Sequence, residues 1–300
     1  MPNMEEKIGN TPLVRLMEIE RIFSLSCALY AKDESKNLGG SIKDRVALSI
    51  LKDAEARRAL KKGGLVVEAT SGNTGIGLAL LGGLRGYKVK ILMPESMSKE
   101  RREMLQRYGA EVELTAAEKG MQGAVERAKA IVRDTKNAVY ADQFCNPACV
   151  RAHYEGTGVE IWAQTQGNVD CFLAGVGTGG TLTGVGRYLK EQNLGIKIIA
   201  IEPSKSPLLS QGVAGAHGIQ GIGANFVPRI LDRTIYDEVL TVTDDEAMAT
   251  ARLLRQKEGL FVGISSGANV AAAVRVASRE ENKGKALVTI LPDCGDRYTW

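Results

Sequence analysis

The sequence lacks the features that mark several classes of protein. Aromatic residues make up 5% of the 300 residues, and they do not alternate with basic residues as nucleic-acid-binding stretches do. No apolar run approaches the length of a membrane span, and the N-terminus has no apolar signal core. Charge of one sign is also scarce: 39 Lys and Arg against 35 Asp and Glu give a net charge of +4. We therefore expect no nucleic-acid partner and no membrane partner.

Cysteine is sparse and irregularly spaced. No two cysteines form a CxxC pair, so neither a zinc site nor a disulfide framework is predicted. We expect a reducing compartment, the cytoplasm, and no metal. The five cysteines are Cys27, Cys145, Cys149, Cys171 and Cys294.

Strand-like and helical segments alternate along most of the chain. The length suits one large α/β domain or two smaller ones, and the hydrophobic fraction of 44% is that of a soluble globular protein. Alternating strands and helices predict mostly parallel sheets with right-handed crossovers. The predicted strands include residues 28–32, 65–68, 88–93, 111–114, 138–140, 171–174, 198–201, 239–242 and 286–291.

One stretch, Ser41-Ile42-Lys43-Asp44-Arg45, combines a helix start with a lysine. A glycine pair precedes Ser41, and helical apolar spacing begins at Ile42. Ser41 and Asp44 are suited to cap this helix. Lys43 would then lie in the first turn, beside unpaired N–H groups and the positive end of the helix dipole. That environment favours the neutral amine, which is the form that attacks a carbonyl to make a Schiff base.

A second loop has the composition of an anion site. An apolar strand ends in Gly175, and Gly177-Thr178-Gly179-Gly180-Thr181 then opens a helix. Such a turn exposes backbone N–H groups at the positive end of the helix dipole, where one phosphate group can bind. Gly175, Gly177 and Gly180 also spell G-x-G-x-x-G, with Glu202 after the next strand. This pattern leaves open a dinucleotide site and a nicotinamide dehydrogenase.

Two further loops place small hydroxyl residues at helix starts. Thr70-Ser71-Gly72-Asn73-Thr74-Gly75 offers hydroxyls, N–H groups and an amide, which can hold a carboxylate. In Gly263-Ile264-Ser265-Ser266-Gly267, one hydroxyl could hydrogen-bond a neutral heterocyclic nitrogen. A Schiff-base lysine, a single-phosphate cup and a carboxylate loop together indicate a pyridoxal phosphate (PLP) enzyme that acts on amino acids.

The ordered motifs resemble one family. S-I-K-D-R, T-S-G-N-T-G, G-V-G-T-G-G-T and G-I-S-S-G are similar to those of the cysteine synthase (O-acetylserine sulfhydrylase) family of fold-type II PLP enzymes. I-G-N-T-P-L-V near the start and L-P-D-C-G-D-R-Y near the end extend the likeness over essentially the whole chain. The resemblance implies two three-layer α/β/α domains with mostly parallel sheets, as in the tryptophan synthase β fold. It implies a smaller, mobile domain (residues 35–145) carrying the carboxylate loop, and a larger phosphate-binding domain (residues 1–34 and 146–300).

The resemblance also implies roles for individual positions. Lys43 matches the lysine that bonds to the cofactor and moves the α-proton, and Asn73 matches the residue that hydrogen-bonds the cofactor's ring hydroxyl oxygen. Ser265 matches the hydroxyl facing the pyridine nitrogen, and Gly221 borders the active-site entrance. The phosphate cup is matched by Gly177, Thr178, Gly179, Gly180 and Thr181. The substrate carboxylate site is matched by Thr70, Ser71, Thr74 and Gln143.

The implied reaction is β-replacement on a serine or cysteine derivative through an aminoacrylate intermediate, with O-acetylserine and sulfide giving cysteine and acetate. An alternative within the family consumes cysteine and releases sulfide, making serine, lanthionine or cystathionine. A homodimer is implied, and serine acetyltransferase is a candidate partner. Asp33 replaces a usual apolar residue, and Asn225 stands where many relatives have glycine. Either could be surface variation or mark a changed second substrate.

Overall fold

The computed structural model describes residues 4–298 and divides the chain into two compact units. The smaller unit comprises residues 1–8 and 43–149, and the larger unit comprises residues 9–42 and 150–300. This division differs from the expected limits at residues 1–8 and 146–149, which belong to the smaller unit, and at residues 35–42, which belong to the larger unit. The reason for residues 35–42 is local packing: the backbone N–H of Ile42 donates to the carbonyl oxygen of Pro292 over 2.8 Å, and Ser41 forms a β-bridge with Asp293.

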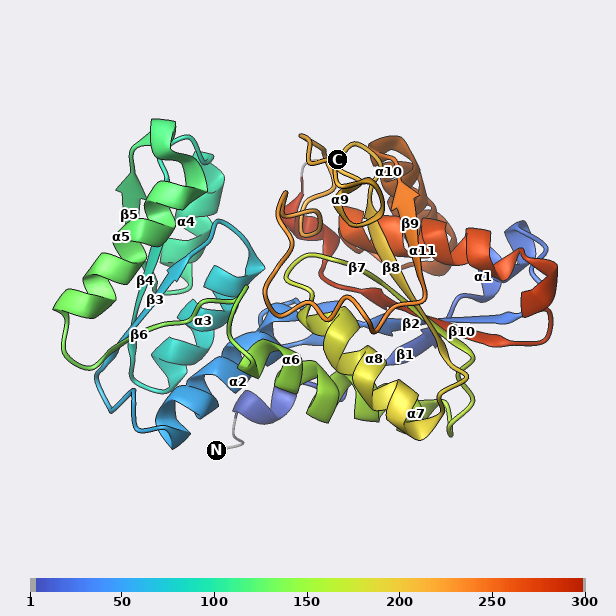
Figure 1. The fold of residues 1–300 in the computed structure, drawn as a ribbon, viewed down its shortest axis with the longest axis horizontal. Coiled ribbons are helices and arrows are strands. Elements are labelled where there is room, and N and C mark those ends of the chain that lie inside the picture. Colours follow the sequence, from blue (N-terminus) through green and yellow to red (C-terminus); the bar gives the residue numbers. More distant parts are fainter. Residues whose placement is uncertain (1–3, 299–300) are drawn as a thin grey trace. The chain divides into compact units, whose positions relative to one another are not determined.

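The smaller unit is built on a fully parallel sheet of four strands in the order β5-β4-β3-β6 (Figure 1). Consecutive residues of a strand point to opposite faces. Leu92 of β4 packs with α5, while Ile91 lies near Gly75 of α3. Helices therefore cover both faces, as predicted. The strands are β3 (Leu65–Ala69), β4 (Lys88–Pro94), β5 (Glu111–Thr115) and β6 (Ala138–Tyr140); the helices are α2 (Lys43–Ala56), α3 (Asn73–Leu84), α4 (Lys99–Arg107) and α5 (Gly120–Asp134).

The larger unit is built on a six-stranded sheet in the order β1-β2-β10-β7-β8-β9. All neighbouring strands are parallel except β1, which pairs antiparallel with β2 at the edge. The long apolar runs of its central strands are typical of parallel sheets covered on both faces. The strands are β1 (Leu13–Arg15), β2 (Ala28–Asp33), β7 (Cys171–Gly175), β8 (Lys197–Pro203), β9 (Glu238–Val242) and β10 (Ala286–Leu291).

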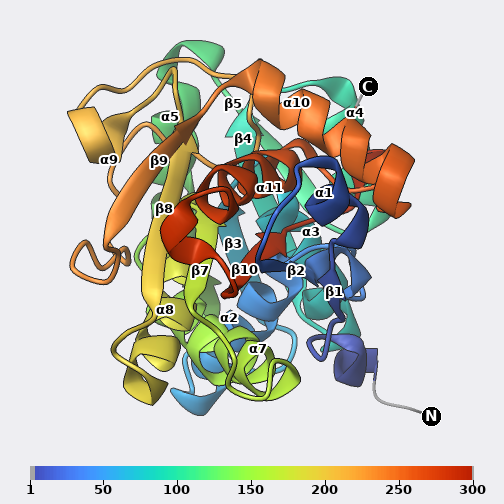
Figure 2. The same ribbon diagram turned by 90° about the vertical axis from the view of Figure 1, so that its right-hand side faces the viewer.

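Alternate residues of this sheet belong to two hydrophobic clusters. Leu173 and Leu287 pack with α10 and α11, which lie side by side on one face (Figure 2). Phe172 and Val288 pack with α7 and α8 on the other. This unit is thus a second three-layer α/β/α sandwich, which confirms the predicted fold class. Its helices are α1 (Met17–Ile22), α7 (Val159–Gln164), α8 (Gly180–Gln192), α9 (Leu208–Gln211), α10 (Asp244–Leu253) and α11 (Ile264–Ala277).

Two π-helical segments interrupt the helices of the larger unit, at His153–Gly158 and at Leu254–Glu258. The first links α6 (Ala148–Ala152) to α7. The sequence predicts a helix over residues 158–164, and in the structure helical conformation begins ten residues earlier, at Ala148. Thr243, followed by Glu246 three residues later, predicts a capping box. The structure confirms it at the start of α10, where each of the two side chains bonds the other residue's backbone N–H. Within residues 4–298, no helix is long and apolar enough to cross a membrane.

Gly267 of α11 sets how closely this helix approaches α10. A Cβ atom at Gly267 would lie 1.9 Å from the carbonyl oxygen of Ala247. Backbone atoms cannot move aside without separating the two helices, so Gly267→Ala should lower the free energy of unfolding by about 1–3 kcal/mol. The control is Gly83→Ala in α3, an exposed position where a Cβ meets nothing within 4 Å. That change should raise stability by about 0.4–1 kcal/mol, because alanine favours helix. Denaturant unfolding measures the free energy of unfolding of both variants. Equal changes in the two variants would contradict this packing argument.

Candidate active site

Lys43 is the first residue of α2 and is partly buried. It therefore lies in the first helical turn, as the sequence predicts, where the helix dipole disfavours a cation. The adjacent helix α3 packs closely there, because a Cβ at Gly77 would lie 3.1 Å from the carbonyl oxygen of Lys43. Burial raises the pKa of the Cys149 thiol to about 12, and Lys43 is among the groups near enough to affect that pKa. Lys43 thus lies close to a neutral, buried thiol in the smaller unit.

The candidate carboxylate residues of the smaller unit lie together. Thr70 follows β3 and accepts a hydrogen bond from the N–H of Gly72 over 3.2 Å. Asn73 and Thr74 open α3. The Thr74 hydroxyl donates to the amide oxygen Oε1 of Gln143 over 2.6 Å. This bond joins segments 69 residues apart and turns the oxygen of Gln143 toward Thr74, so its NH₂ group remains to donate elsewhere.

A cation adjoins the same loop. Arg101 of α4 donates from Nη1 to the hydroxyl oxygen of Ser71 over 3.1 Å. The sequence reasoning missed Arg101 because it belongs to a charged helix, in which nothing sets one arginine apart from its neighbours. Together with the two threonine hydroxyls, this guanidinium gives the loop the composition of a carboxylate-binding site.

The glycine-rich turn of residues 177–181, here called the phosphate cup, lies between β7 and α8 in the larger unit. Gly179 has φ of +82°, a left-handed conformation that favours glycine, and it is the N-cap residue of α8. Gly180 is the first residue of the helix and donates its N–H to the Thr178 hydroxyl over 3.4 Å. The cup therefore presents the N-terminus of a 13-residue helix without bulky side chains.

Gly177 and Gly221 approach each other so closely that no room remains for a side chain at Gly177. A Cβ at Gly177 would lie 2.3 Å from the carbonyl oxygen of Gly221. A Cβ at Gly221 would in turn lie 3.7 Å from the Ser265 hydroxyl oxygen. Ser265 is buried in the first turn of α11. Three predicted positions that are distant in sequence thus lie next to one another in the larger unit.

His153 was missed by the sequence reasoning and lies behind the cup. It is buried, with Nδ1 3.0 Å from the Thr157 hydroxyl and Nε2 3.3 Å from the Thr181 hydroxyl. The π-helical segment that begins at His153 determines this position, and residue spacing does not reveal such a segment. Histidine therefore fixes the hydroxyl of Thr181 at the start of α8.

The residues of the larger unit fit the phosphate and ring nitrogen of PLP. The cup leaves room for a phosphate at a helix N-terminus, because residues 177–181 carry only hydrogen, hydroxyl and methyl groups beyond the backbone. The buried Ser265 supplies a neutral hydrogen-bonding group near Gly221. No carboxylate occurs in either set, so nothing there would repel a phosphate.

Glu202, the acidic residue of the dinucleotide pattern, is already engaged. Its carboxylate accepts from the N–H of Leu209 over 2.7 Å and of Ser210 over 3.0 Å, and from the Ser210 hydroxyl over 2.6 Å. It thereby caps the short helix α9 and is buried. A dinucleotide site requires this carboxylate for a ribose hydroxyl. Its engagement argues against the dehydrogenase alternative.

The two unusual residues have local structural explanations. Asp33 is buried, accepts from the N–H and hydroxyl of Ser35, and caps the 3₁₀ turn η2 (Glu34–Lys36). Asn225 has φ of +62°, and its side-chain oxygen accepts from the Ser206 hydroxyl over 2.7 Å. Asparagine is among the few residues that replace glycine readily in this conformation.

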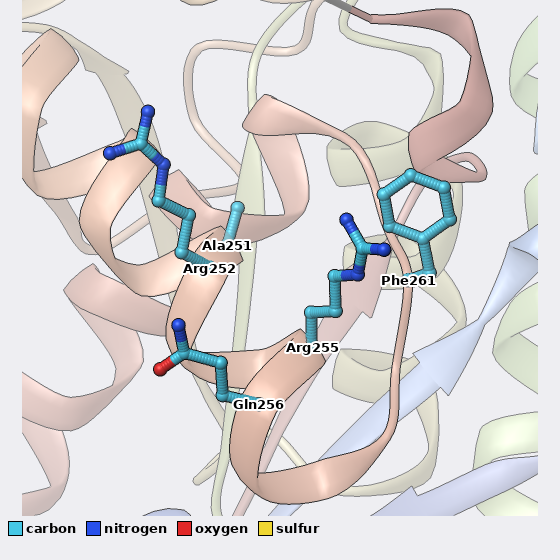
Figure 3. A pocket seen from close by; sticks show the side chains of 5 residues that line it. All are labelled: Ala251, Arg252, Arg255, Gln256 and Phe261. Carbon is cyan, nitrogen blue, oxygen red and sulfur yellow. The ribbon is translucent and has the colours of Figure 1, made fainter. Parts of the chain in front are cut away.

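A separate surface pocket of about 540 Å³ lies on α10 and the following π-helical segment (Figure 3). The Arg255 guanidinium lies over the Phe261 ring, 4.4 Å from its centre. None of the sequence-predicted site residues lines this pocket; its lining residues are Ala251, Arg252, Arg255, Gln256 and Phe261.

Comparison with known proteins gives one consistent family. A family model described as "Pyridoxal-phosphate dependent enzyme" matches residues 4–293. The chain is 49% identical to cysteine synthase 3 of Caenorhabditis elegans, over 98% of this chain and 87% of that protein. Cysteine synthase from Entamoeba histolytica has a similar structure, with a TM-score of 0.95 and 42% identity over 99% of this chain and 89% of that one.

A hydrogen sulfide-producing enzyme from Fusobacterium nucleatum is also similar in structure, with a TM-score of 0.93 and 39% identity over the full length of both chains. The family model, the sequence relatives and the structures agree with the ordered motifs. The chain therefore belongs to the family of pyridoxal-phosphate-dependent enzymes, in its cysteine synthase branch, and requires PLP as its cofactor.

Proposed function

We propose that the protein is a cysteine synthase that replaces the acetate of O-acetylserine with sulfide. The bond between the β-carbon and the acetyl oxygen breaks, a carbon–sulfur bond forms at the same carbon, and the products are cysteine and acetate. The observation that carries this proposal is the hydrogen bond of Thr74 to Gln143, which gathers groups for an amino-acid carboxylate on the unit that also carries Lys43. Relatives named cysteine synthase, at 49% and 46% identity, support the reaction type.

Lys43 is the residue assigned to covalent attachment and to proton transfer. Bound PLP supplies an aldehyde that links to an amine and a ring that withdraws electrons from the substrate's α-carbon. The Nζ atom of Lys43 holds the cofactor at rest, then takes the α-proton of the substrate and later returns it. Its place in the first turn of α2 supports this role, because the dipole there favours the neutral amine.

The cup and Ser265 are assigned to cofactor binding. The backbone N–H groups at Gly179, Gly180 and Thr181 bind the phosphate, with the hydroxyls of Thr178 and Thr181 beside them. Asn73 would hydrogen-bond the ring hydroxyl oxygen of bound PLP, and Ser265 would hydrogen-bond its ring nitrogen. A serine partner leaves that nitrogen without a carboxylate to stabilise its protonated form, which weakens the electron withdrawal and favours β-replacement over transamination.

Substrate binding is assigned to the smaller unit. Thr70, Ser71, Thr74 and the amide NH₂ of Gln143 hold the carboxylate of the amino acid. Gly221, which belongs to the larger unit, borders the entrance for substrate. Arg101 supplies positive charge next to Ser71. These contacts orient the amino acid so that its α-proton is presented to Lys43.

A second candidate reaction uses cysteine as the donor and releases sulfide. The similarity to the sulfide-producing enzyme of Fusobacterium nucleatum favours this second reaction. That enzyme is 39% identical to this chain, which is close to the 42% identity of the Entamoeba histolytica cysteine synthase. The carboxylate and cofactor contacts serve both donors equally. Only the groups that face the β-substituent distinguish them.

We also propose that the enzyme works in the cytoplasm as a homodimer, with serine acetyltransferase as a candidate partner. All five cysteines are free thiols, which supports a reducing compartment. The dimer and the partner are proposed on the family resemblance alone.

The assignment of Lys43 predicts where the cofactor is attached. Borohydride treatment of the yellow holoenzyme should fix the cofactor permanently, and peptide mapping should find it on Lys43. Lys43→Ala should abolish turnover and the reducible linkage. Lys52→Ala, an exposed position on the same helix, should keep both. A reduced adduct on any other lysine would refute the assignment.

The cup predicts that one glycine controls cofactor affinity. In Gly179→Ala, a left-handed alanine costs about 1–2 kcal/mol, and its Cβ would lie 2.7 Å from that of Leu231. The strain displaces the N-terminus of α8, so the Kd for PLP should rise by about tenfold or more. Calorimetric titration of apoprotein measures this change.

The matched control is Gly212→Ala. Gly212 also has positive φ, +73°, but a Cβ there meets nothing within 4 Å. It imposes the same backbone cost outside the cup and should leave the Kd unchanged. Equal Kd values for the two variants would show that the turn at Gly179 does not bind the phosphate.

A further inference from the structure

Glu68 is a carboxylic acid in the interior of the smaller unit. It lies on β3, two residues before Thr70, with 1% of its surface exposed. Its partner in the neighbouring strand is Ile91, which faces α3. A charged group in such a place is costly unless it is paired, and no ion pair to Glu68 occurs within residues 4–298. The position of this acid therefore requires an explanation.

The Glu68 carboxyl group holds the backbone that follows β6. The N–H of Gln143 donates to its Oε2 over 3.4 Å, and the N–H of Asp142 lies near enough to this carboxyl to lower its pKa. Asp142 has φ of +50°, a conformation that is unfavourable for a residue with a side chain. The chain leaves β6 through Ala141, whose N–H still bonds to Val67 on β3. Glu68 thus stabilises a strained turn that directly follows the last hydrogen bond between this segment and β3.

The same turn places the side chain of Gln143. Its Oε1 accepts from the Thr74 hydroxyl over 2.6 Å, and both residues are buried. A continuous chain of hydrogen bonds therefore runs from Glu68 through the backbone of residues 142–143 to the Gln143 amide and Thr74. Moving the turn by about one ångström would break the Thr74 bond.

We propose that Glu68 is a positioning residue that sets Gln143 for the substrate carboxylate, and that it does so as a neutral, proton-bearing acid. The proposal rests on the proposed function of Gln143. A neutral acid accepts the backbone N–H bonds through its carbonyl oxygen and avoids placing a second negative charge beside Asp142. Opening of the turn would expose Glu68 to water, where it ionises at ordinary pH.

The surroundings of Glu68 favour the protonated form. Burial, followed by the negative charge of Asp142, raises the pKa of Glu68 to about 8, although the backbone N–H groups near the carboxyl, that of Gln143 first, oppose this shift. The other titratable groups nearby are Tyr140 on β6 and the Cys149 thiol, and Lys43 lies near that thiol. Burial raises the pKa of both Tyr140 and Cys149. In the closed turn, Glu68 therefore remains protonated up to about pH 8.

The direction of the pH effect follows from the two pKa values. In the open turn the pKa returns to about 4.5, and in the closed turn it is about 8. Between these values the closed form binds one more proton, so the stabilisation by Glu68 is complete below pH 4.5 and is lost as pH rises to 8. Above pH 8 the dependence levels off.

The test is hydrogen exchange of the backbone amides of residues 142 and 143 in the holoenzyme, from pH 5 to 9. In wild-type protein their protection factors should fall by up to about tenfold per pH unit until about pH 8, then become constant. Glu68→Gln keeps a neutral acceptor, so protection should persist without this slope. Glu111→Gln, an exposed carboxylate in the same sheet, should leave the wild-type slope unchanged. A slope that survives in Glu68→Gln would overturn the proposal.

Kinetics separates this proposal from the function on which it rests. Gln143→Ala should lower kcat/KM for O-acetylserine by about 10- to 150-fold, and Glu68→Ala should lower it in the same direction. If Glu68 acts through Gln143, the double variant is no worse than the more affected single variant. Additive losses would refute the positioning role. An unchanged kcat/KM in Gln143→Ala would instead refute the carboxylate assignment, while the exchange slopes would still decide the role of Glu68.

Discussion

In the larger unit, the candidate cofactor site depends on the close approach of two backbone segments, at Gly177 and Gly221. A methyl group at Gly177 would come within 2.3 Å of the Gly221 carbonyl oxygen, so any side chain at Gly177 would force the two loops apart. The left-handed turn at Gly179 then directs the chain into α8, whose first N–H groups lie outside the hydrogen bonds of the helix itself. Glycine is required at Gly177 because there is no space for a side chain, and at Gly179 because the backbone is left-handed. Ser265 is placed against the same loop by the packing of α11 on α10.

The smaller unit uses polar bonds where the larger one uses close packing. Its candidate groups follow the carboxyl ends of neighbouring parallel strands, β3 and β6, which brings residues 70–74 and 143 to one edge of the sheet. Strand order alone puts them near each other. The hydrogen bond between Thr74 and Gln143, and the buried acid behind it, determine the orientation of the amide. The parallel α/β fold thus brings the candidate residues together, and a small network of hydrogen bonds orients their side chains.

The sequence predicts most of the fold because apolar periodicity is strong in parallel sheets. The strand at residues 286–291 and the capping box at Thr243 agree with the structure residue by residue. The edge strand β1 and the short helix α1 are too brief to give a periodic signal, and the π-helical turn at His153 has none. The candidate site is predicted where glycine and hydroxyl residues cluster. Arg101, His153 and Glu68 are not predicted, because their partners lie 28 to 75 residues away and local patterns carry no such information.

Asp33 and Asn225 show how a departure from a family pattern can have a local cause. The first caps a 3₁₀ turn and the second occupies a left-handed position that accepts asparagine. Neither observation requires a changed reaction, so the choice of donor rests on other groups and is open to a direct chemical measurement.

That measurement is the identification of the products formed by the holoenzyme from different donors. O-acetylserine, O-phosphoserine and cysteine are offered separately, each with and without sulfide, and amino acids, acetate and sulfide are quantified. The account predicts that O-acetylserine with sulfide gives cysteine and acetate in equal amounts, with sulfide consumed. Release of sulfide from cysteine, with no cysteine formed from O-acetylserine, would contradict it.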